Sequence, residues 1–262
     1  MKKKTKRVAS VISVLVALVI IVAFVFYMNI KNFTVRKVLM SNQQEVYLMG
    51  TFHRDHFKRY ANYSVEEILN AINNIEPDAI FIEAREDSFR EYGVVDGPID
   101  MCVIYSYCME HNIPVEMIDY WKIDNNFKEN TTNPFRDDKI HENIMKKLNS
   151  YKDEKILVVC GFGHLNAQTE RLLEAGGKKE KIAHRASIFK SQTSDFSYPG
   201  TVCDVWKKRV LFYGHTVPKL VHEDDTISDE MKATWVEDTN NSYYDMQMKY
   251  CVLFQNNGLY LE

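Results

Sequence analysis

Apolar and polar positions divide the chain into a long uncharged segment and a region where short apolar runs alternate with amphipathic stretches. Residues 8–30, VASVISVLVALVIIVAFVFYMNI, contain no charged side chain, and the residues before them, MKKKTKR, include five basic ones. About 20 apolar residues are enough to cross a bilayer as a helix. The pattern therefore predicts a transmembrane helix within residues 1–30.

The sequence around this segment predicts an uncleaved signal anchor. Secretory signals have a shorter apolar core and small residues before the cleavage site, whereas the end of this run, AFVFYMNIKNF, has no A-x-A pattern. Basic flanks stay on the cytoplasmic side of a membrane. We therefore expect a single-pass cell-membrane protein with a cytoplasmic amino terminus and an extracellular domain. A cleaved signal peptide is the alternative, and it would also place the domain outside.

The rest of the chain alternates between predicted strands and predicted helices. Residues 31–44 read as a polar connector, and residues 45–262 as the domain. Apolar runs bounded by turn residues predict strands at residues 45–50, 78–84, 113–119 and 154–161. Apolar residues at helical spacing predict helices at residues 64–75, 97–112, 137–151 and 164–177. Ser64 and Glu67 predict a capping box on the first helix, and Asp137 a cap on the third.

This alternation predicts an α/β fold with a mostly parallel sheet and helices on its faces. The predicted strands are short and apolar, as parallel strands buried on both faces are. Beyond residue 178 the pattern weakens. RVLFYGH (209–215) and KYCVLFQ (249–255) predict further strands, and Asn257-Gly258 predicts a terminal hairpin. These would be antiparallel additions to the sheet near the carboxyl terminus.

Charge and cysteine content narrow the classes of function. The 262 residues carry a net charge of −3, and the isoelectric point is about 6.3. A nucleic-acid partner is not expected, because such proteins carry a basic face. The five cysteines form no C-x-x-C pair, and their odd number leaves at least one outside any internal disulfide. Buried free thiols are favoured over a disulfide framework.

Polar side chains suited to catalysis lie at the end of nearly every predicted strand. They are His53, His56, Glu83, Asp119, His164 and His215. The carboxyl ends of parallel strands meet at one edge of a sheet, and sites form there. We therefore expect His53, Glu83 and His164 to converge in one site. The remaining three are weaker candidates for the same site.

Two of these histidines share a spacing. Gly50 stands three positions before His53, and Gly161 stands three positions before His164, each after an apolar strand. Glycine permits a sharp turn and a close backbone approach. Each G-x-x-H motif can thus direct an imidazole over the sheet edge.

Each candidate also has a structural interpretation. Glu83 would be costly to bury unpaired, so it can instead form a salt bridge with Arg85 or Arg136. A histidine at a strand end can also have a purely structural role, in which it caps a turn. The other histidines are expected at the surface, namely His111, His141, His184 and His222.

The segments GTFH, IFIEA and VVCGFGHL resemble the TraB/PrgY/TIKI superfamily, which is related to GumN and to erythromycin esterase-like and ChaN-like proteins. That family is marked by paired G-x-x-H motifs and a glutamate after the second strand. Arg136, in NPFRDDKIHENI, resembles the family's arginine just before the helix that precedes the second G-x-x-H. The resemblance covers roughly residues 45–177.

The resemblance implies a membrane-tethered, outward-facing hydrolase. TIKI members are proteases that need a divalent metal such as manganese or cobalt, whereas other relatives hydrolyse esters. ChaN-like members bind haem iron, and PrgY-type members block peptide pheromones. We therefore expect a metal-dependent peptidase that acts on peptides or protein N-termini. Unlike PrgY and TIKI, this chain carries its one predicted anchor at the amino end.

In this interpretation His53, Glu83 and His164 are a sufficient ligand set for a catalytic metal with an open position. The metal-bound water would be the nucleophile, and the cation would polarise a carbonyl. Arg136 would hold a substrate carboxylate or the developing oxyanion. Mixed nitrogen and oxygen ligands leave zinc, manganese and cobalt open.

Two alternatives remain open. One histidine, oriented by Glu83, can act as a general base without a metal. The chain can also be a non-catalytic, membrane-anchored binding protein that sequesters a signalling peptide or a metal or haem ligand. The sequence contains neither G-x-S-x-G nor H-E-x-x-H, which argues against a serine nucleophile of that type and against a zincin.

Overall fold

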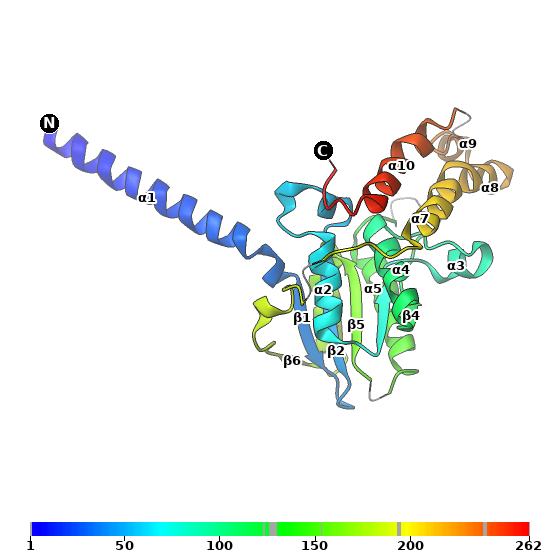
Figure 1. Cartoon of the computed structure of the whole chain (residues 1–262), viewed down its shortest axis with the longest axis horizontal. Coiled ribbons are helices and arrows are strands. Elements are labelled where there is room, and N and C mark those ends of the chain that lie inside the picture. The colour runs from blue at the N-terminus through cyan, green and yellow to red at the C-terminus, as the bar shows by residue number, and fades with distance from the viewer. Residues whose placement is uncertain are drawn as a thin grey trace.

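The computed structural model describes residues 2–122, 124–125, 130–152, 154–192, 195–237 and 240–261. Within the first helix, side chains are described at residue 12 and from residue 14 onward. A long helix, α1, projects from a body that is built around one twisted sheet (Figure 1).

Within the described residues, six strands form a mixed sheet in the order β4-β3-β5-β2-β1-β6. The strands are β1 (Val35–Leu39), β2 (Glu45–Thr51), β3 (Ala79–Ile82), β4 (Val115–Met117), β5 (Ile156–Gly161) and β6 (Lys178–Glu180). The four strands from β4 to β2 run parallel, whereas β1 pairs antiparallel with β2 and β6. The predicted α/β fold with flanking helices is confirmed.

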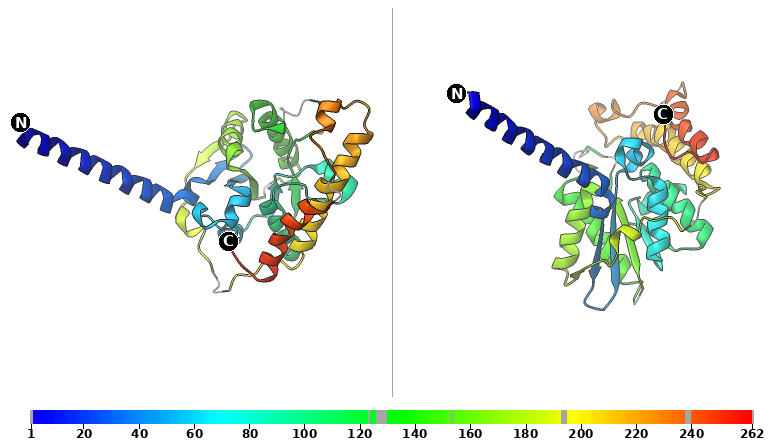
Figure 2. Two further views of the ribbon diagram at one scale, coloured as in Figure 1. Left: turned by 90° about the horizontal axis from the view of Figure 1, so that it is seen from above. Right: turned by 60° about the vertical axis from the view of Figure 1, so that its left-hand side comes forward.

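Helices cover both faces of the sheet (Figure 2). One core contains residues of α2 (Val65–Ile75), α4 (Ile99–His111), α7 (Val202–Leu211) and α10 (Ser242–Gln255). The other core contains residues of α5 (Pro134–Leu148) and α6 (Phe162–Glu174). The shorter elements are η1 (Ile30–Phe33), η2 (His53–Phe57), η3 (Arg59–Ala61), α3 (Glu86–Tyr92), η5 (Arg185–Ser187), η6 (Phe212–Thr216), α8 (Val217–Glu223) and α9 (Asp229–Lys232).

The central strands β3 and β5 are buried along their whole length. Side chains alternate between the faces of a strand, so Ile82 and Val159 enter the first core while Phe81 and Val158 enter the second. Because both faces are covered, every position of these strands has to be apolar or small. This explains the unbroken apolar runs in the sequence.

The helix starts agree in part with the prediction. Ser64 and Glu67 form the predicted capping box at α2, each side chain binding the backbone of the other. The predicted cap of α5 is wrong, because α5 begins at Pro134 and its cap is Asn133, which accepts the backbone N–H of Arg136. Asp137 therefore lies inside the first turn, where its carboxylate is free for another partner.

The carboxyl-terminal third is helical, so the strands predicted at residues 209–215 and 249–255 are wrong. The buried residues of α7 are Val202, Trp206 and Val210, which follow a helical repeat rather than the alternation of a strand. The predicted hairpin is also wrong: Asn257 adopts a left-handed conformation just after α10, and no strand follows in the described residues.

The antiparallel part of the sheet lies elsewhere than predicted. β1 lies within residues 31–44, which were predicted to be a connector. It pairs along its length with β2. Two partly exposed residues, Arg36 and Lys37, separate its buried residues Val35 and Val38, so the sequence shows no strand alternation there. Antiparallel pairing thus adds β1 and β6 beside β2 rather than strands from the carboxyl terminus.

One disulfide joins two of the carboxyl-terminal helices. Cys203 of α7 and Cys251 of α10 are bonded, whereas Cys102, Cys108 and Cys160 are buried free thiols. The prediction of free thiols is therefore wrong for Cys203 and Cys251. The two bonded cysteines are 48 residues apart, and only the packing of α7 against α10 brings them together.

The amino-terminal helix α1 runs from Lys2 to Met28. Its large apolar side chains from Val14 to Met28 are exposed. A search of the described residues finds no helix that combines enough length with enough apolarity to cross a membrane. The span predicted at residues 8–30 falls in part on residues 8–11 and 13, whose side chains lie outside the described part.

Candidate catalytic site

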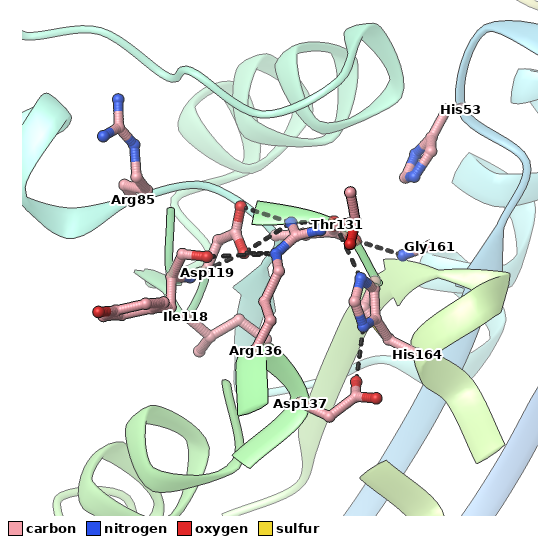
Figure 3. A network of polar contacts seen from close by, with 12 residues as sticks. His53, Arg85, Ile118, Asp119, Thr131, Arg136, Asp137, Gly161 and His164 are labelled. Atoms are coloured by element: carbon pink, nitrogen blue, oxygen red, sulfur yellow. Dashed lines mark hydrogen bonds and ion pairs between the residues drawn. The ribbon is translucent and has the colours of Figure 1, made fainter. Parts of the chain in front are cut away.

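The ends of three neighbouring strands bring the main predicted site residues together, and Figure 3 shows two of them, His53 and His164, with Gly161 and Arg136. β5 lies between β2 and β3, and it pairs Gly161 with Thr51 on one side and Val159 with Ile82 on the other. His53, Glu83 and His164 each follow one of these strands by one to three residues. The predicted convergence is therefore present in the fold.

Glu83 lies at the centre of this group and is only 3% exposed. Its Oε2 accepts the backbone N–H of Gly161, at the start of α6. Its Oε1 lies 2.9 Å from Nη2 of Arg136 and 3.6 Å from Nε2 of His164. The carboxylate thus sits between a guanidinium, an imidazole and a helix amino terminus, which stabilise its negative charge.

His164 is held by a second carboxylate. It lies in the first turn of α6, is buried, and its Nδ1 is 2.6 Å from Oδ1 of Asp137. Gln168 donates to the backbone oxygen of Asp137 and so helps to fix this residue. The Nδ1–H donates to Asp137, which fixes the ring so that Nε2 lies on the side of Glu83.

His53 is held in the same way from the other side. Its Nδ1 lies 3.3 Å from Oδ1 of the fully buried Asp100, which stands in the first turn of α4. Burial alone would lower the pKa of this imidazole, but the charge and hydrogen bond of Asp100 outweigh burial and raise it to about 9. Asp100 itself has its pKa lowered to about 2, because His53 outweighs the effect of burial. The pair is an imidazolium and a carboxylate at neutral pH.

The backbone of His53 has a φ of 53°, in the left-handed region. Residues other than glycine are uncommon in this region, and those that adopt it are concentrated at functional sites. In this conformation His53 lines a cavity of about 680 Å³.

The glycines of the two G-x-x-H motifs make room for the opposite motif. A Cβ at Gly161 would lie 2.5 Å from Nε2 of His53 and 3.3 Å from Oε2 of Glu83. A Cβ at Gly50 would lie 3.0 Å from Cδ2 of Phe162, in the first turn of α6. Nε2 of His53 and Oε2 of Glu83 therefore border the same small space beside Gly161.

Arg136 is a bridge between two carboxylates. Its Nη2 lies 2.9 Å from Oε1 of Glu83 and 2.8 Å from Oδ1 of Asp119, and its Nε donates to the backbone oxygen of Tyr120. Burial raises the pKa of Asp119 even though Arg136 opposes this effect. Of the two partners considered for Glu83, Arg136 is the one observed, since Arg85 pairs with Asp96 and stacks on Trp121.

Two weaker candidates lie in structural roles. His56 is fully buried; its Nε2 accepts the backbone N–H of Phe52, and its Nδ1 is 2.7 Å from the backbone oxygen of Tyr63. Burial lowers its pKa, so it is a neutral ring that ties the η2 turn together. His215 lies in η6, 3.6 Å from Glu237, and has no contact with the central group among the described interactions.

Sequence reasoning missed the two aspartates that orient the histidines. Asp100 and Asp137 each stand in the first turn of a helix. Acidic residues are common there because they favour the helix dipole. Their sequence signal was therefore the same as that of an ordinary helix start.

The family resemblance implies a divalent metal, for which His53, Glu83 and His164 would be the ligands. Two imidazole nitrogens and one carboxylate suit such a metal chemically. However, both oxygens of Glu83 already accept hydrogen bonds, from Arg136 and from the Gly161 N–H. Across the described residues, no group of three or more His, Cys, Asp and Glu side chains is arranged to hold a metal ion. These side chains do not fit a metal, and no step is derived through one.

Comparison of the chain with protein families, with curated proteins and with solved structures finds no match. The resemblance to the TraB/PrgY/TIKI superfamily stays a prediction from the sequence motifs.

Proposed function

We propose that this protein is a metal-independent hydrolase of peptide or ester bonds. The observation that carries the proposal is the pair of carboxylate–imidazole contacts, His53 with Asp100 and His164 with Asp137, on either side of Glu83. Each carboxylate binds Nδ1 and leaves Nε2 for the space between the rings. Two imidazoles facing one space are suited to proton transfer during the attack of water on a carbonyl.

The two rings have different roles in this proposal. His53 keeps a proton at neutral pH because its pKa is about 9, so it is the general acid. His164, whose Nδ1–H faces Asp137, is the general base. Nε2 of His164 takes a proton from water as the water oxygen attacks the carbonyl carbon. Nε2 of His53 gives a proton to the leaving nitrogen or oxygen as the acyl bond breaks.

The remaining charged groups hold this arrangement in place. The charge of Glu83 favours the protonated form of His53. Arg136 prevents two buried carboxylates, Glu83 and Asp119, from facing each other uncompensated. Removing one member of such a buried network leaves an unpaired charge. Arg136 is therefore a positioning residue rather than an open clamp for substrate.

We place this hydrolase on the outer side of a membrane, held by α1. The exposed side chains from Val14 to Met28 are apolar, and α1 projects away from the body (Figure 1). The Cys203–Cys251 disulfide supports the outward location, because disulfides persist in oxidising compartments. Protease added to intact cells should remove the domain, and permeabilised cells are the control. Full protection of the domain in intact cells would contradict this location.

Turnover by the full chain in neutral detergent micelles tests the chemistry. The substrates are a panel of acyl p-nitroanilides and p-nitrophenyl esters, each assayed with and without a chelator. We expect turnover that persists with chelator and falls in the variants His53→Gln, His164→Gln and Glu83→Gln. His222→Gln is the matched control, because His222 contacts only a backbone oxygen far from the site in the described interactions.

Two results would contradict the proposal. Turnover that disappears with chelator and returns with manganese or zinc would restore the metal-dependent alternative. Tight binding of the compounds without any turnover would favour the sequestering protein.

A further inference from the structure

The cavity beside His53 has walls from four separate elements. The η2 turn contributes His53, the start of α4 contributes Ile99, and α7 and α10 contribute Trp206 and Tyr250. Its volume of about 680 Å³ is in the range of small-molecule and peptide side-chain sites. A substrate bound in this cavity would lie beside His53.

The lining of this cavity is strongly basic. Arg54, Lys58, Arg209 and Lys249 line it, against one acidic residue, Asp55. The chain as a whole carries a net charge of −3, so the lining of this cavity is more positive than the rest of the protein. Like-signed side chains around a cavity raise the local concentration of ligands of the opposite sign.

Two of the four cations form neither an ion pair nor a hydrogen bond with the described residues. Lys58 pairs with Asp55 at 3.0 Å, and Arg209 donates to the backbone oxygens of Asp96 and Gly97. Arg54 and Lys249 are both exposed, and neither forms an ion pair within the described part of the chain. They are therefore available to an anionic group of a ligand.

The same cavity also has a fixed aromatic wall. Trp206 and Tyr250 are buried, with ring centroids 5.6 Å apart, and Nε1 of Trp206 donates to the backbone oxygen of Gln247. The Cys203–Cys251 disulfide joins the two helices that carry these rings. An aromatic surface held this firmly binds a flat or apolar group at little entropic cost.

We infer that this cavity is the substrate-recognition site, and that it selects acyl compounds with an aromatic group near the scissile carbonyl and a carboxylate farther along. Trp206 and Tyr250 contact the aromatic group, and Arg54 and Lys249 bind the carboxylate. This inference rests on the proposed hydrolase for the identity of the scissile bond. The recognition itself depends only on the cavity and can be measured without turnover.

Matched ligands separate recognition from chemistry. Succinyl-phenylalanine amide and acetyl-phenylalanine amide share one scaffold, and only the first has a carboxylate. Their dissociation constants for the full chain in neutral detergent are measured by calorimetry, and kcat/KM is measured for the corresponding p-nitroanilides. We expect the succinyl compounds to be preferred about tenfold in both measurements, as for one charge-assisted hydrogen bond. The preference should fall as ionic strength rises.

Charge variants assign the preference to the proposed residues. In the double variant Arg54→Gln and Lys249→Gln, the affinity for the acetyl ligand should be unchanged while the succinyl preference disappears. Lys208→Gln is the control for the loss of a surface charge, because it removes one positive charge from the exposed face of α7 without lining the cavity. The preference should be retained in this control.

The possible outcomes distinguish the two proposals. A succinyl preference in binding, without turnover of either p-nitroanilide, supports the recognition site and overturns the hydrolase. Turnover of both compounds with equal kcat/KM and equal affinity leaves the hydrolase and overturns the recognition site. Absence of binding to both amides, or a preference that survives the double variant, also overturns the recognition site.

Discussion

The two G-x-x-H motifs begin with the same spacing and end in different surroundings. After β2, His53 lies in a 3₁₀ turn with left-handed backbone, and 34% of its side chain is exposed. After β5, His164 lies in the first turn of a regular α-helix, and only 3% of its side chain is exposed. The motif alone therefore sets where an imidazole is placed, and the element that follows sets what it can reach.

The carboxylate partners of His53 and His164 also differ in their effect. Asp100 holds a proton on the exposed ring of His53, whereas Asp137 holds Nδ1 of the enclosed ring of His164. A proton donor on the cavity wall and an acceptor in the enclosed part of the site are the two partners that hydrolysis of a carbonyl needs. The following experiments test whether the two motifs differ in this way.

Removal of either imidazole should produce the largest effect. Changing His53→Gln or His164→Gln should lower kcat by about 10²- to 10⁴-fold, because a positioned acid or base contributes roughly that much. The His53 variant should melt earlier, because the fully buried Asp100 is left without its partner. The His164 variant should also melt earlier, because Asp137 is left buried without its partner. Steady-state kinetics and thermal melts check both, and equal kcat in variant and parent would remove that histidine from the mechanism.

The glycines offer a second way to separate the motifs. In Gly161→Ala the new Cβ meets Nε2 of His53 at 2.5 Å, so the ring must move. Misplacement by about 1 Å can cost roughly 10²-fold in rate, and we expect a loss of that size in kcat/KM. In Gly50→Ala the new Cβ meets Phe162 at 3.0 Å, which overpacks the start of α6 and costs about 1–3 kcal/mol of stability. The reverse order of the two variants in activity would contradict this geometry.

The pH dependence should sharpen the assignment of His53 as the acid. With a pKa of about 9, the ring loses its proton as the pH rises through that value, and kcat/KM should fall there. In Asp100→Asn the charge that holds the proton is gone. The alkaline limb should then move toward the ordinary imidazole pKa of about 6.5. A limb that stays near pH 9 in this variant would assign it to another group.

The same shifts have a consequence for stability. A raised pKa for His53 contributes to folding fully below about pH 6.5, and the contribution is lost as the pH rises through about 9. The lowered pKa of Asp100 contributes above the usual range of a carboxyl, and that contribution is lost as the pH falls through about 2. The melting temperature should therefore fall at both extremes of pH. In Asp100→Asn, its fall at alkaline pH should be smaller.

His56 should show the smallest effect on activity. It stands three residues after His53, but both of its ring nitrogens bind the backbone of its own loop. His56→Gln should cost about 1–3 kcal/mol of unfolding free energy, since buried backbone groups lose their partners. We expect kcat to change by less than about threefold. Urea unfolding and the standard assay measure both, and a large loss of kcat with normal stability would give His56 a catalytic role.

Much of the fold was readable from sequence because its strong signals are local. Unbroken apolar runs marked β2, β3 and β5, and the Ser64–Glu67 pair marked the start of α2. The failures have a common cause. Val210 to His215 and Tyr250 to Gln255 are short apolar runs, and a run of that length is compatible with both a strand and a buried helix. The tertiary contact between α7 and α10 decides for the helix, and it cannot be seen locally.

The site residues could be predicted from the sequence where they directly follow strands. His53, Glu83 and His164 were found because parallel strands end at one edge of a sheet. Asp100 and Asp137 come from helix starts that pack beneath that edge, and only the packing of α4 and α5 reveals them. Arg136 was found through the family resemblance, and its position between Glu83 and Asp119 was not predictable from any spacing.

The order of the strands has a consequence for how the chain acquires its site during synthesis. β2 and β3 are not neighbours in the sheet; β5 lies between them and pairs with both. A growing chain that ends before residue 156 holds two separate strand pairs, β1 with β2 and β3 with β4. His53 and Glu83 then have no common scaffold. Insertion of β5 is a long-range event, which is slow because distant segments must meet. Incomplete chains are therefore expected to lack the assembled site, so that chemistry begins only when most of the domain has been made.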